Sequence, residues 1–183
     1  INIFPHNQYC LKYGGTHDDL APFVINQHRN GLLTPWGYNA NHGIPQLTLE
    51  DYVTSRYILN PLRIWDCDRP VTASAAYLFT TADRARDMKQ PPVYVLNHSQ
   101  HNFRQRTTQP DLDEIEEWTD RAARRMYEGA GLGPQDVDIF NPYDGYATMT
   151  QFFLEAFQWH GVKRGDAFAF YAGDTRVAGP HPF

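Results

Sequence analysis

The feature that most constrains the fold is an alternation of short apolar runs with segments that carry helix-start signals. The apolar runs lie at residues 75–80, 93–97, 137–141 and 168–171. Consecutive apolar positions are typical of strands in a sheet that is covered on both faces. Strands that alternate with helices therefore predict an α/β fold built in layers.

Helix starts are marked by two capping boxes, Thr16 with Asp19 and Thr48 with Asp51. In such a box the threonine side chain accepts a backbone hydrogen bond, and the acid three residues later reaches back to the cap. Pro22 has to delay or kink the first of these helices.

The longest helix is expected from about residue 112 to residue 128, and another from about 146 to 160. Acidic residues early and arginines late match the helix dipole, and Gly129 supplies the preferred C-cap. Apolar residues at helical spacing give the longest helix one buried face. They are Leu112, Ile115, Trp118 or Thr119, Ala122 and Met126.

Composition excludes several classes of protein. The 183 residues carry a formal net charge of -5, so the chain lacks the basic excess of a general nucleic-acid surface. Its apolar runs fall far short of the roughly 20 residues that span a bilayer. Two cysteines, Cys10 and Cys67, are too few for a disulfide framework or a structural zinc site. We therefore expect a globular protein of the reducing cytoplasm.

A family resemblance enters at residues 127–138, Tyr-Glu-Gly-Ala-Gly-Leu-Gly-Pro-Gln-Asp-Val-Asp. This segment resembles the helix–turn–strand junction of thiolases and ketoacyl synthases. Further blocks at residues 47–57, 60–67 and 80–87 resemble, in the same order, the lipid-transfer (sterol-carrier) branch of the thiolase superfamily. The resemblance implies a five-layered αβαβα thiolase fold. Residues 1–183 would supply one thiolase-like domain, namely the end of the first half and much of the second.

The same resemblance implies that the chain acts on acyl-CoA thioesters, with coenzyme A as part of the substrate and no other cofactor or metal. It also implies a homodimer and, by analogy with steroid-cleaving relatives, a small OB-fold partner with a zinc ribbon. The chain departs from the family, because the N-terminal nucleophilic cysteine and the C-terminal glycine-rich strand are not in this sequence. The usual T-D-G-A reads Thr72-Ala73-Ser74-Ala75. We therefore expect the 183 residues to be inactive alone, as a fragment or the ordered part of a longer chain.

The sharpest candidate site is Tyr143-Asp144-Gly145-Tyr146, directly after an expected strand and before an expected helix. The corresponding turn reads N-E-A-F in thiolases and H-D-C-F in sterol-carrier thiolases, and its first residue faces the thioester. The resemblance therefore implies that Tyr143 faces the substrate. A phenol can donate to an oxyanion or exchange a proton with a hydroxyl, although an ordinary pKa of about 10 makes it a poor base. The alternative is a tyrosine packed at a strand end.

Three other residues belong to the candidate site. Asp144 either orients a catalytic partner or, as we favour, caps the next helix through nearby backbone N–H groups. Tyr146 takes the place of a family phenylalanine, so it either contacts substrate or, as we favour, fills the core. His42, in a loop with Trp36 and Tyr38, either lines a hydrophobic entrance or is an exposed loop histidine.

Neither cysteine is expected to be a nucleophile, because a thiol needs a base or a helix N-terminus to become a thiolate. Cys67 reads as a buried structural residue on the way into the expected middle strand, and Cys10 is assigned to packing among aromatic neighbours.

Two other clusters favour a surface interpretation over a site. His98 and His101 could form a metal pair, but no third ligand stands at a suitable spacing. Arg84, Arg86 and Lys89 could attract the phosphates of CoA. Acidic residues are interleaved with them, so a solvated helix is the simpler interpretation.

Three functions remain open. The first is retro-aldol cleavage of a β-hydroxyacyl-CoA with a bulky, apolar, steroid-like side chain, which a tyrosine in place of histidine or asparagine suggests. The second is an acetyl-CoA acetyltransferase-type thiolase whose cysteine lies upstream of this sequence. The third is a non-catalytic subunit that binds lipid or acyl-CoA.

Overall fold

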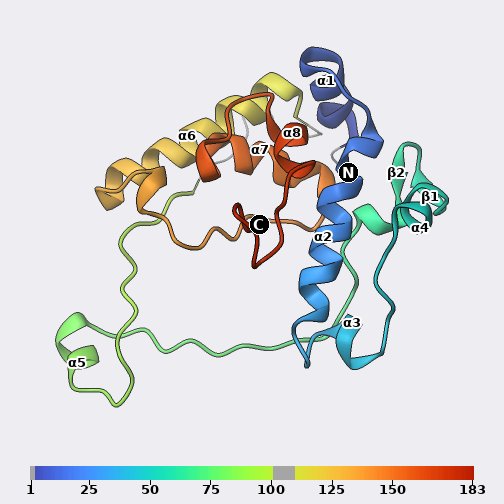
Figure 1. The fold of residues 1–183 in the computed structure, drawn as a ribbon. Coiled ribbons are helices and arrows are strands. Elements are labelled where there is room, and N and C mark those ends of the chain that lie inside the picture. The colour runs from blue at the N-terminus through green and yellow to red at the C-terminus, as the bar shows by residue number, and fades with distance from the viewer. Residues whose placement is uncertain (1–2, 101–109) are drawn as a thin grey trace.

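The computed structural model describes residues 3–100 and 110–183, and Figure 1 shows how they are arranged. Within these residues, strand pairing is limited to a hairpin of β1 (Tyr57–Leu59) and β2 (Leu62–Arg63) and an isolated bridge between Cys67 and Tyr146. The α-helices are α1 (Ile3–Tyr13), α2 (Ala21–Leu32), α3 (Tyr38–Asn41), α4 (Leu49–Val53), α5 (Ala82–Arg86), α6 (Leu112–Ala130), α7 (Ala147–Ala156) and α8 (Ala167–Tyr171). Short 3-10 helices are η1 (His17–Leu20), η2 (Ile64–Asp66), η3 (Pro134–Asp136) and η4 (Trp159–Gly161).

Both predicted capping boxes are confirmed. The Thr16 backbone N–H donates to Asp19 Oδ2 at 2.7 Å at the start of η1, which leads directly into α2. Pro22 lies in the first turn of α2, where its missing N–H costs nothing. At α4, Thr48 Oγ1 accepts from the Asp51 N–H at 3.1 Å. Short polar side chains thus decide where these two helical segments begin.

Helix α6 confirms the longest predicted helix. Its N-cap is Asp111, whose carboxylate accepts a hydrogen bond from the Glu114 N–H at 2.8 Å. The helix ends at Gly131, which adopts a left-handed φ of 69°. Gly129, expected as the C-cap, therefore lies inside the helix. The buried face consists of Leu112, Ile115, Thr119 and Ala123.

Gly129 instead allows the segment that returns from α5 to approach α6. The Asn97 side-chain amide donates to the carbonyl oxygens of Arg125, at 2.8 Å, and Met126, at 3.2 Å. A Cβ at position 129 would lie only 2.2 Å from Asn97 Nδ2, so a side chain there would displace Asn97. This contact ties the end of the returning segment to the helix.

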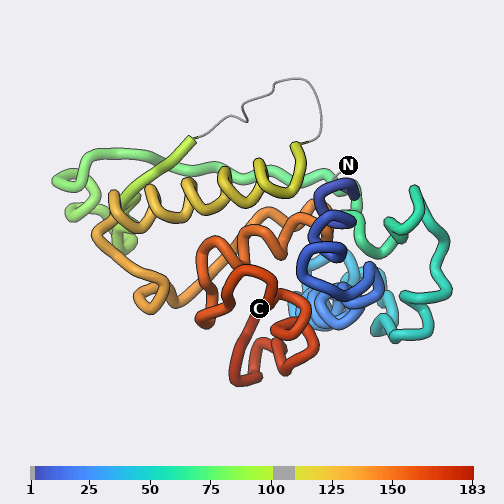
Figure 2. Tube along the Cα trace, turned by 90° about the horizontal axis from the view of Figure 1, so that it is seen from above, coloured from blue at the N-terminus to red at the C-terminus, as the bar shows by residue number. Residues whose placement is uncertain are grey.

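The core forms around α7, with α1, α6 and α8 packed beside it (Figure 2). Phe152 and Leu154 of α7 are fully buried, and the Trp118 ring of α6 packs perpendicular to Phe153 at 5.7 Å. The helix is buried on nearly all sides, and its buried polar residues Gln151 and Glu155 lie within hydrogen-bonding distance of His6 and of the Ala167 N–H. The helix is shorter than the sequence predicts, because Gln158 and His160 adopt left-handed φ angles of 53° and 51°. No helix among the described residues is both long and apolar enough to cross a membrane.

The strand predicted at residues 168–171 is wrong, because this segment forms α8. An apolar run of this length fits a buried helix as well as a strand, and periodicity cannot separate the two. Tertiary contacts decide for the helix: the Ala167 N–H at its start donates at 3.1 Å to the buried carboxylate of Glu155 on α7. That carboxylate also accepts a hydrogen bond from Tyr9 and pairs with Arg164.

The strands predicted at residues 75–80, 93–97 and 137–141 do not form either. The first two belong to an extended excursion that leaves the helical body, with α5 at its far end (Figure 1). Residues 137–141, expected to be a buried strand, form no strand: Val137 and Phe140 pack partly buried against the core, and Ile139 is 85% exposed. A strand needs a hydrogen-bonded neighbour, and no described residue pairs with these segments. In the first two segments the apolar side chains are accordingly exposed, as for Tyr77, Leu78, Phe79, Val93 and Val95.

Replacement of the α6 cap tests this account of helix starts. We expect Asp111→Ala to lower the free energy of unfolding by about 1 kcal/mol, because the Glu114 N–H loses its acceptor. Asp111→Asn keeps an acceptor and should lose clearly less. Urea denaturation followed by circular dichroism measures both. Equal losses in the two variants would show that capping is not what stabilises this end of the helix.

Candidate functional site

The Tyr143–Tyr146 turn is held against the segment that follows η2. The Gly145 carbonyl accepts a hydrogen bond from the Asp68 N–H at 3.2 Å, and Tyr146 forms an antiparallel bridge with Cys67. Segments nearly eighty residues apart in sequence therefore meet here. The turn leads directly into α7, so the core helix fixes its position from the other side.

Tyr143 folds back over Gly145. A Cβ at position 145 would lie 2.2 Å from Tyr143 Oη and 2.4 Å from its Cζ, so this ring position requires glycine. The Tyr143 side chain is otherwise open to solvent, and the residue is 60% exposed. The phenol is thus placed by the turn and remains accessible to a ligand.

A pocket of about 620 Å³ opens beside this turn. Its volume is within the usual range for a small-molecule site. One wall is α2, a second is residues 64–70, and Asp144 and Ala147 belong to a third. The lining residues that matter below are Phe23, Val24, His28, Trp65, Arg69 and Asp144.

His28 is the lining residue with the least usual surroundings. It is 8% exposed, and its Nδ1 accepts a hydrogen bond from the Leu47 N–H at 3.3 Å. The Trp65 ring stands perpendicular to the imidazole at 5.9 Å. Burial lowers the pKa of His28, and the nearby Arg69 guanidinium adds to this. The ring is therefore neutral at physiological pH.

The predicted site residues differ in how far they are buried. Asp144 is exposed at the pocket wall and does not cap α7, because the helix begins at Ala147 with Tyr146 as its N-cap and no side-chain hydrogen bond. The predicted capping role of Asp144 is therefore wrong. Tyr146 is half-buried and packs against the core. His42 is exposed and stacks on Tyr38, a residue of the pocket rim, with ring centroids 4.1 Å apart.

Neither cysteine is activated. Burial raises the pKa of the half-buried Cys67 thiol, and the carboxylates of Asp66 and Asp68 raise it further. Burial likewise raises the pKa of Cys10 to about 11, although its sulfur lies 3.7 Å from His6 Nε2. Both thiols therefore stay protonated at neutral pH, as the sequence analysis expects.

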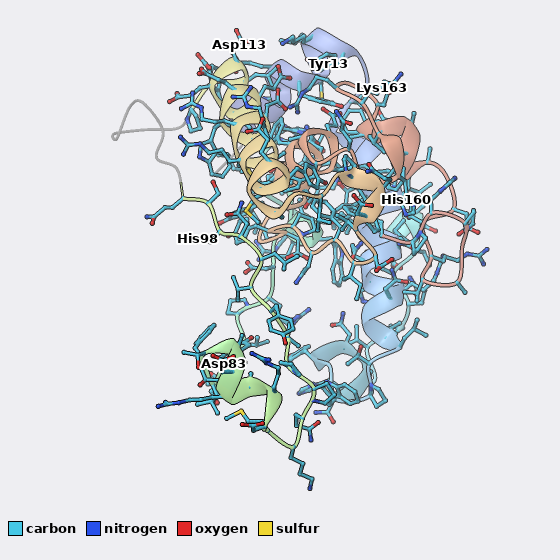
Figure 3. All side chains as sticks on the ribbon, turned by 90° about the vertical axis from the view of Figure 1, so that its left-hand side faces the viewer. Tyr13, Asp83, His98, Asp113, His160 and Lys163 are labelled. Atoms are coloured by element: carbon cyan, nitrogen blue, oxygen red, sulfur yellow. The ribbon has the colours of Figure 1, made fainter. Side chains whose placement is uncertain are left out.

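The two surface clusters remain apart from the pocket. His98 is exposed on the segment between α5 and α6, and Asp83 lies with the basic residues on the protruding α5 (Figure 3). His101 falls outside the described residues, so the predicted pair stays untested. Within the described part of the chain, no three His, Cys, Asp or Glu side chains converge in a way that could hold a metal ion.

A buried polar network behind the pocket was missed by the sequence analysis. Its centre is Asp66, which is 2% exposed. One carboxylate oxygen accepts from Tyr52 Oη at 2.7 Å, and the other lies 2.7 Å from His17 Nε2 and 2.5 Å from the Arg63 N–H. His17 Nδ1 is 3.1 Å from His6 Nε2. The network thus joins α1, η1, α4 and η2.

The network continues to α7, where His6 Nδ1 lies 3.3 Å from Gln151 Oε1. Two proton arrangements satisfy it. In one, both ring nitrogens of His17 carry a proton. His17 Nδ1 then donates to His6 Nε2, and His6 Nδ1 donates to Gln151 Oε1. In the other, both rings are neutral and the Gln151 amide is turned so that its NH₂ donates to His6.

The local sequence does not predict the residues of this polar network. His6, His17, Asp66 and Gln151 have no mutual spacing that a motif could encode, because tertiary folding alone brings them together. His28 did leave a signal: it follows buried Val24 by four residues, so it stands as a polar residue on the apolar face of α2.

The chain is similar to one described protein family and to several known proteins. Residues 99–183 match the family described as "Thiolase C-terminal domain-like". Over 96% of its length the chain is 31% identical to a 17-hydroxy-3-oxo-4-pregnene-20-carboxyl-CoA lyase of Mycobacterium tuberculosis, of which it covers 45%. It is 26% identical, over 96% of the chain and 45% of the relative, to a steroid side-chain-cleaving aldolase of Thermomonospora curvata.

An acetyl-CoA acetyltransferase of Methanothermobacter thermautotrophicus is also similar, at 28% identity over 96% of this chain and 44% of the relative. Among solved structures, the Ltp2-ChsH2(DUF35) aldolase superposes with a TM-score of 0.71 at 23% identity, over 99% of this chain and 47% of that one. This likeness supports the predicted fold class, a partial thiolase-type α/β fold. The chain spans about half the length of the curated relatives that it matches.

The histidine network should make stability depend on pH. Burial, and to a lesser extent His17, lowers the pKa of His6 from 6.5 to about 4, so the folded protein binds this proton less readily than the unfolded chain. The contribution is fully present above pH 6.5 and is lost as pH falls toward 4, by up to roughly 3 kcal/mol. Urea unfolding at several pH values should give a shallower acid slope for His6→Gln than for wild type.

A matched control is His98→Gln, which removes an exposed histidine and should leave the acid slope unchanged. Identical slopes for His6→Gln and wild type would refute the linkage to His6.

Proposed function

We propose that the chain forms part of an acyl-CoA aldolase, and the match of residues 99–183 to the family described as "Thiolase C-terminal domain-like" supports this. Its substrate would be a β-hydroxyacyl-CoA with a bulky, apolar, steroid-like side chain. Its reaction would be retro-aldol cleavage of the bond between Cα and Cβ. The observation that carries the proposal is the exposed Tyr143 ring, which packs on Gly145 and directly precedes Asp144, a residue of the pocket wall.

The names of relatives support this choice. One is a lyase of a steroid carboxyl-CoA, and another is a steroid side-chain-cleaving aldolase. Both match 96% of this chain. The pocket itself supports an apolar ligand body, because Phe23, Val24 and Trp65 line it.

The chemistry needs few groups. A base removes the β-hydroxyl proton, the oxygen electrons form a carbonyl, and the Cα–Cβ bond breaks. Its electron pair passes to the thioester as an enolate, which takes up a proton at Cα and leaves a shorter acyl-CoA. In this proposal Tyr143 exchanges the hydroxyl proton or donates to the developing oxyanion, and either role needs an accessible phenol.

The remaining predicted residues have supporting roles in this scheme. Asp144 orients the substrate or a catalytic partner from the pocket wall, where its carboxylate is exposed. Tyr146 anchors the turn in the core, and His42 contacts substrate at the rim through its stack on Tyr38. Coenzyme A enters as part of the substrate and no other cofactor is invoked. We further propose a cytoplasmic homodimer that works with a small OB-fold, zinc-ribbon partner.

A thiolase-type acetyltransferase is the second candidate, because one relative carries that name. That chemistry requires a thiolate nucleophile, whereas burial raises the pKa of both Cys10 and Cys67. An acetyltransferase would therefore have to use a cysteine other than these two. The aldolase makes no such demand on the chain.

Loss of one hydroxyl tests the proposal. In the intact protein we expect Tyr143→Phe to cut turnover by at least roughly 10²-fold while substrate still binds, because the ring is kept and only the O–H is lost. Release of a shorter acyl-CoA from a β-hydroxyacyl-CoA with a bulky apolar tail measures this. The assay is run with and without the partner protein.

Three variants serve as comparisons. Tyr146→Phe and Cys67→Ala should change turnover little. Gly145→Ala should lower turnover, because a methyl group at this position displaces the Tyr143 ring. If Tyr143→Phe keeps near-wild-type turnover and a cysteine replacement abolishes it, thiolase chemistry takes the place of the aldolase. If no variant turns over acyl-CoA but all bind it, the chain is a binding subunit.

A further inference from the structure

The His28 imidazole carries a hydrogen-bond donor that nothing uses. Since Nδ1 accepts from the Leu47 N–H, the ring proton of the neutral form resides on Nε2. Nε2 is buried and has no hydrogen-bond partner among the described residues. The perpendicular Trp65 ring offers only a weak aromatic contact in place of an oxygen.

A buried donor without a partner is costly to a protein. Such a group typically costs about 1 to 3 kcal/mol, because it gives up its hydrogen bond to water and gains none in return. An apolar residue at position 28 would avoid this cost, since the position lies on the buried face of α2 and lines the pocket together with Val24. The cost is recovered if a bound ligand supplies the missing acceptor.

The other walls of the pocket limit what that ligand can be. Near His28, the walls are apolar, from Phe23, Val24 and Trp65. The carboxylates of Asp68 and Asp144 also belong to the pocket, and they disfavour a ligand that is anionic over its whole length. The one guanidinium of the lining, Arg69, lies over the Tyr38 ring at 4.6 Å, so its charge is already engaged by an aromatic face. A neutral acceptor therefore fits the depth of the pocket best.

We propose that His28 is a specificity-determining residue whose Nε2–H donates a hydrogen bond to a neutral carbonyl oxygen on the apolar body of the ligand. The inference rests on the proposed function only in placing the acyl body of the substrate in this pocket. It goes further in requiring that this body carry an oxygen remote from the thioester. An apolar body without that oxygen would leave the donor unpaired and bind less well.

Two probes that differ by one oxygen test the inference. The steroid ketone androst-4-en-3-one and the hydrocarbon androst-4-ene are titrated into wild type and His28→Phe, with quenching of tryptophan fluorescence as the readout. Trp65→Phe checks that the signal arises in this pocket. The preference for ketone over hydrocarbon is compared between the two proteins, so that the hydration of each probe cancels. We expect that preference to drop about tenfold in His28→Phe.

A second measurement needs no substitution. With a ¹³C-labelled carbonyl, difference infrared spectra of the ketone bound to wild type should show a stretch shifted to lower frequency, as for a hydrogen-bonded carbonyl. An equal preference in both proteins, an unshifted stretch, or no binding of either probe would overturn the inference. Should His28→Phe fail to fold after losing the acceptor for Leu47, the infrared result decides.

These outcomes are separable from those of the proposed function. Tyr143→Phe should keep the full preference for the ketone, because the phenol is not the group that recognises this oxygen. Cleavage that depends on Tyr143 without any role of His28 in ketone binding removes only this inference. Ketone recognition by His28 in a protein without lyase activity removes only the aldolase.

Discussion

The rest of the site depends on the hydrogen bonds around the buried carboxylate of Asp66. A carboxylate at this depth is tolerable only when donors replace its water, and here Tyr52, His17 and the Arg63 N–H surround it. These donors come from α4, η1 and the end of β2, so one side chain joins three segments. Loss of any partner would leave part of a charge unpaired in the core.

Because Asp66 is fixed, the residues after it are fixed as well. Cys67 and Asp68 provide the backbone to which Tyr146 and Gly145 pair, and this pairing sets the turn that presents Tyr143. The segment also brings Trp65 and Arg69 to the pocket opposite α2. The polar network and the pocket therefore lie on two sides of the same segment, and the turn that carries the exposed Tyr143 is held in place by this pairing.

The helices could be predicted from the sequence because their signals are local. Caps such as Thr48 and Asp111 act within one turn, and the apolar stripe of α6 needs only its own residues. The strands could not be predicted in this way, because strand pairing depends on neighbouring segments that the local sequence does not reveal. Residues 168–171 fold as a helix through a contact with Glu155, and residues 75–80 find no partner among the described residues. The family resemblance nevertheless led to the right fold class.

In the candidate site, too, local motifs could be predicted from the sequence and long-range contacts could not. The Tyr143 turn could be found from sequence because it is one short motif, whereas Asp66, His17 and His28 owe their surroundings to contacts distant in the chain. Capping by Asp144 was expected and does not occur, because α7 begins beyond its reach.

In our proposal, the acyl body of a CoA substrate lies in the pocket beside the Tyr143–Tyr146 turn. The most direct measurement is a crystal structure of the intact protein with an acyl-CoA that has the steroid-like tail but lacks the β-hydroxyl and so cannot be cleaved. The account predicts the apolar tail between α2 and Trp65, with the Tyr143 hydroxyl facing Cβ. A tail bound elsewhere, with this pocket left to solvent, would contradict it.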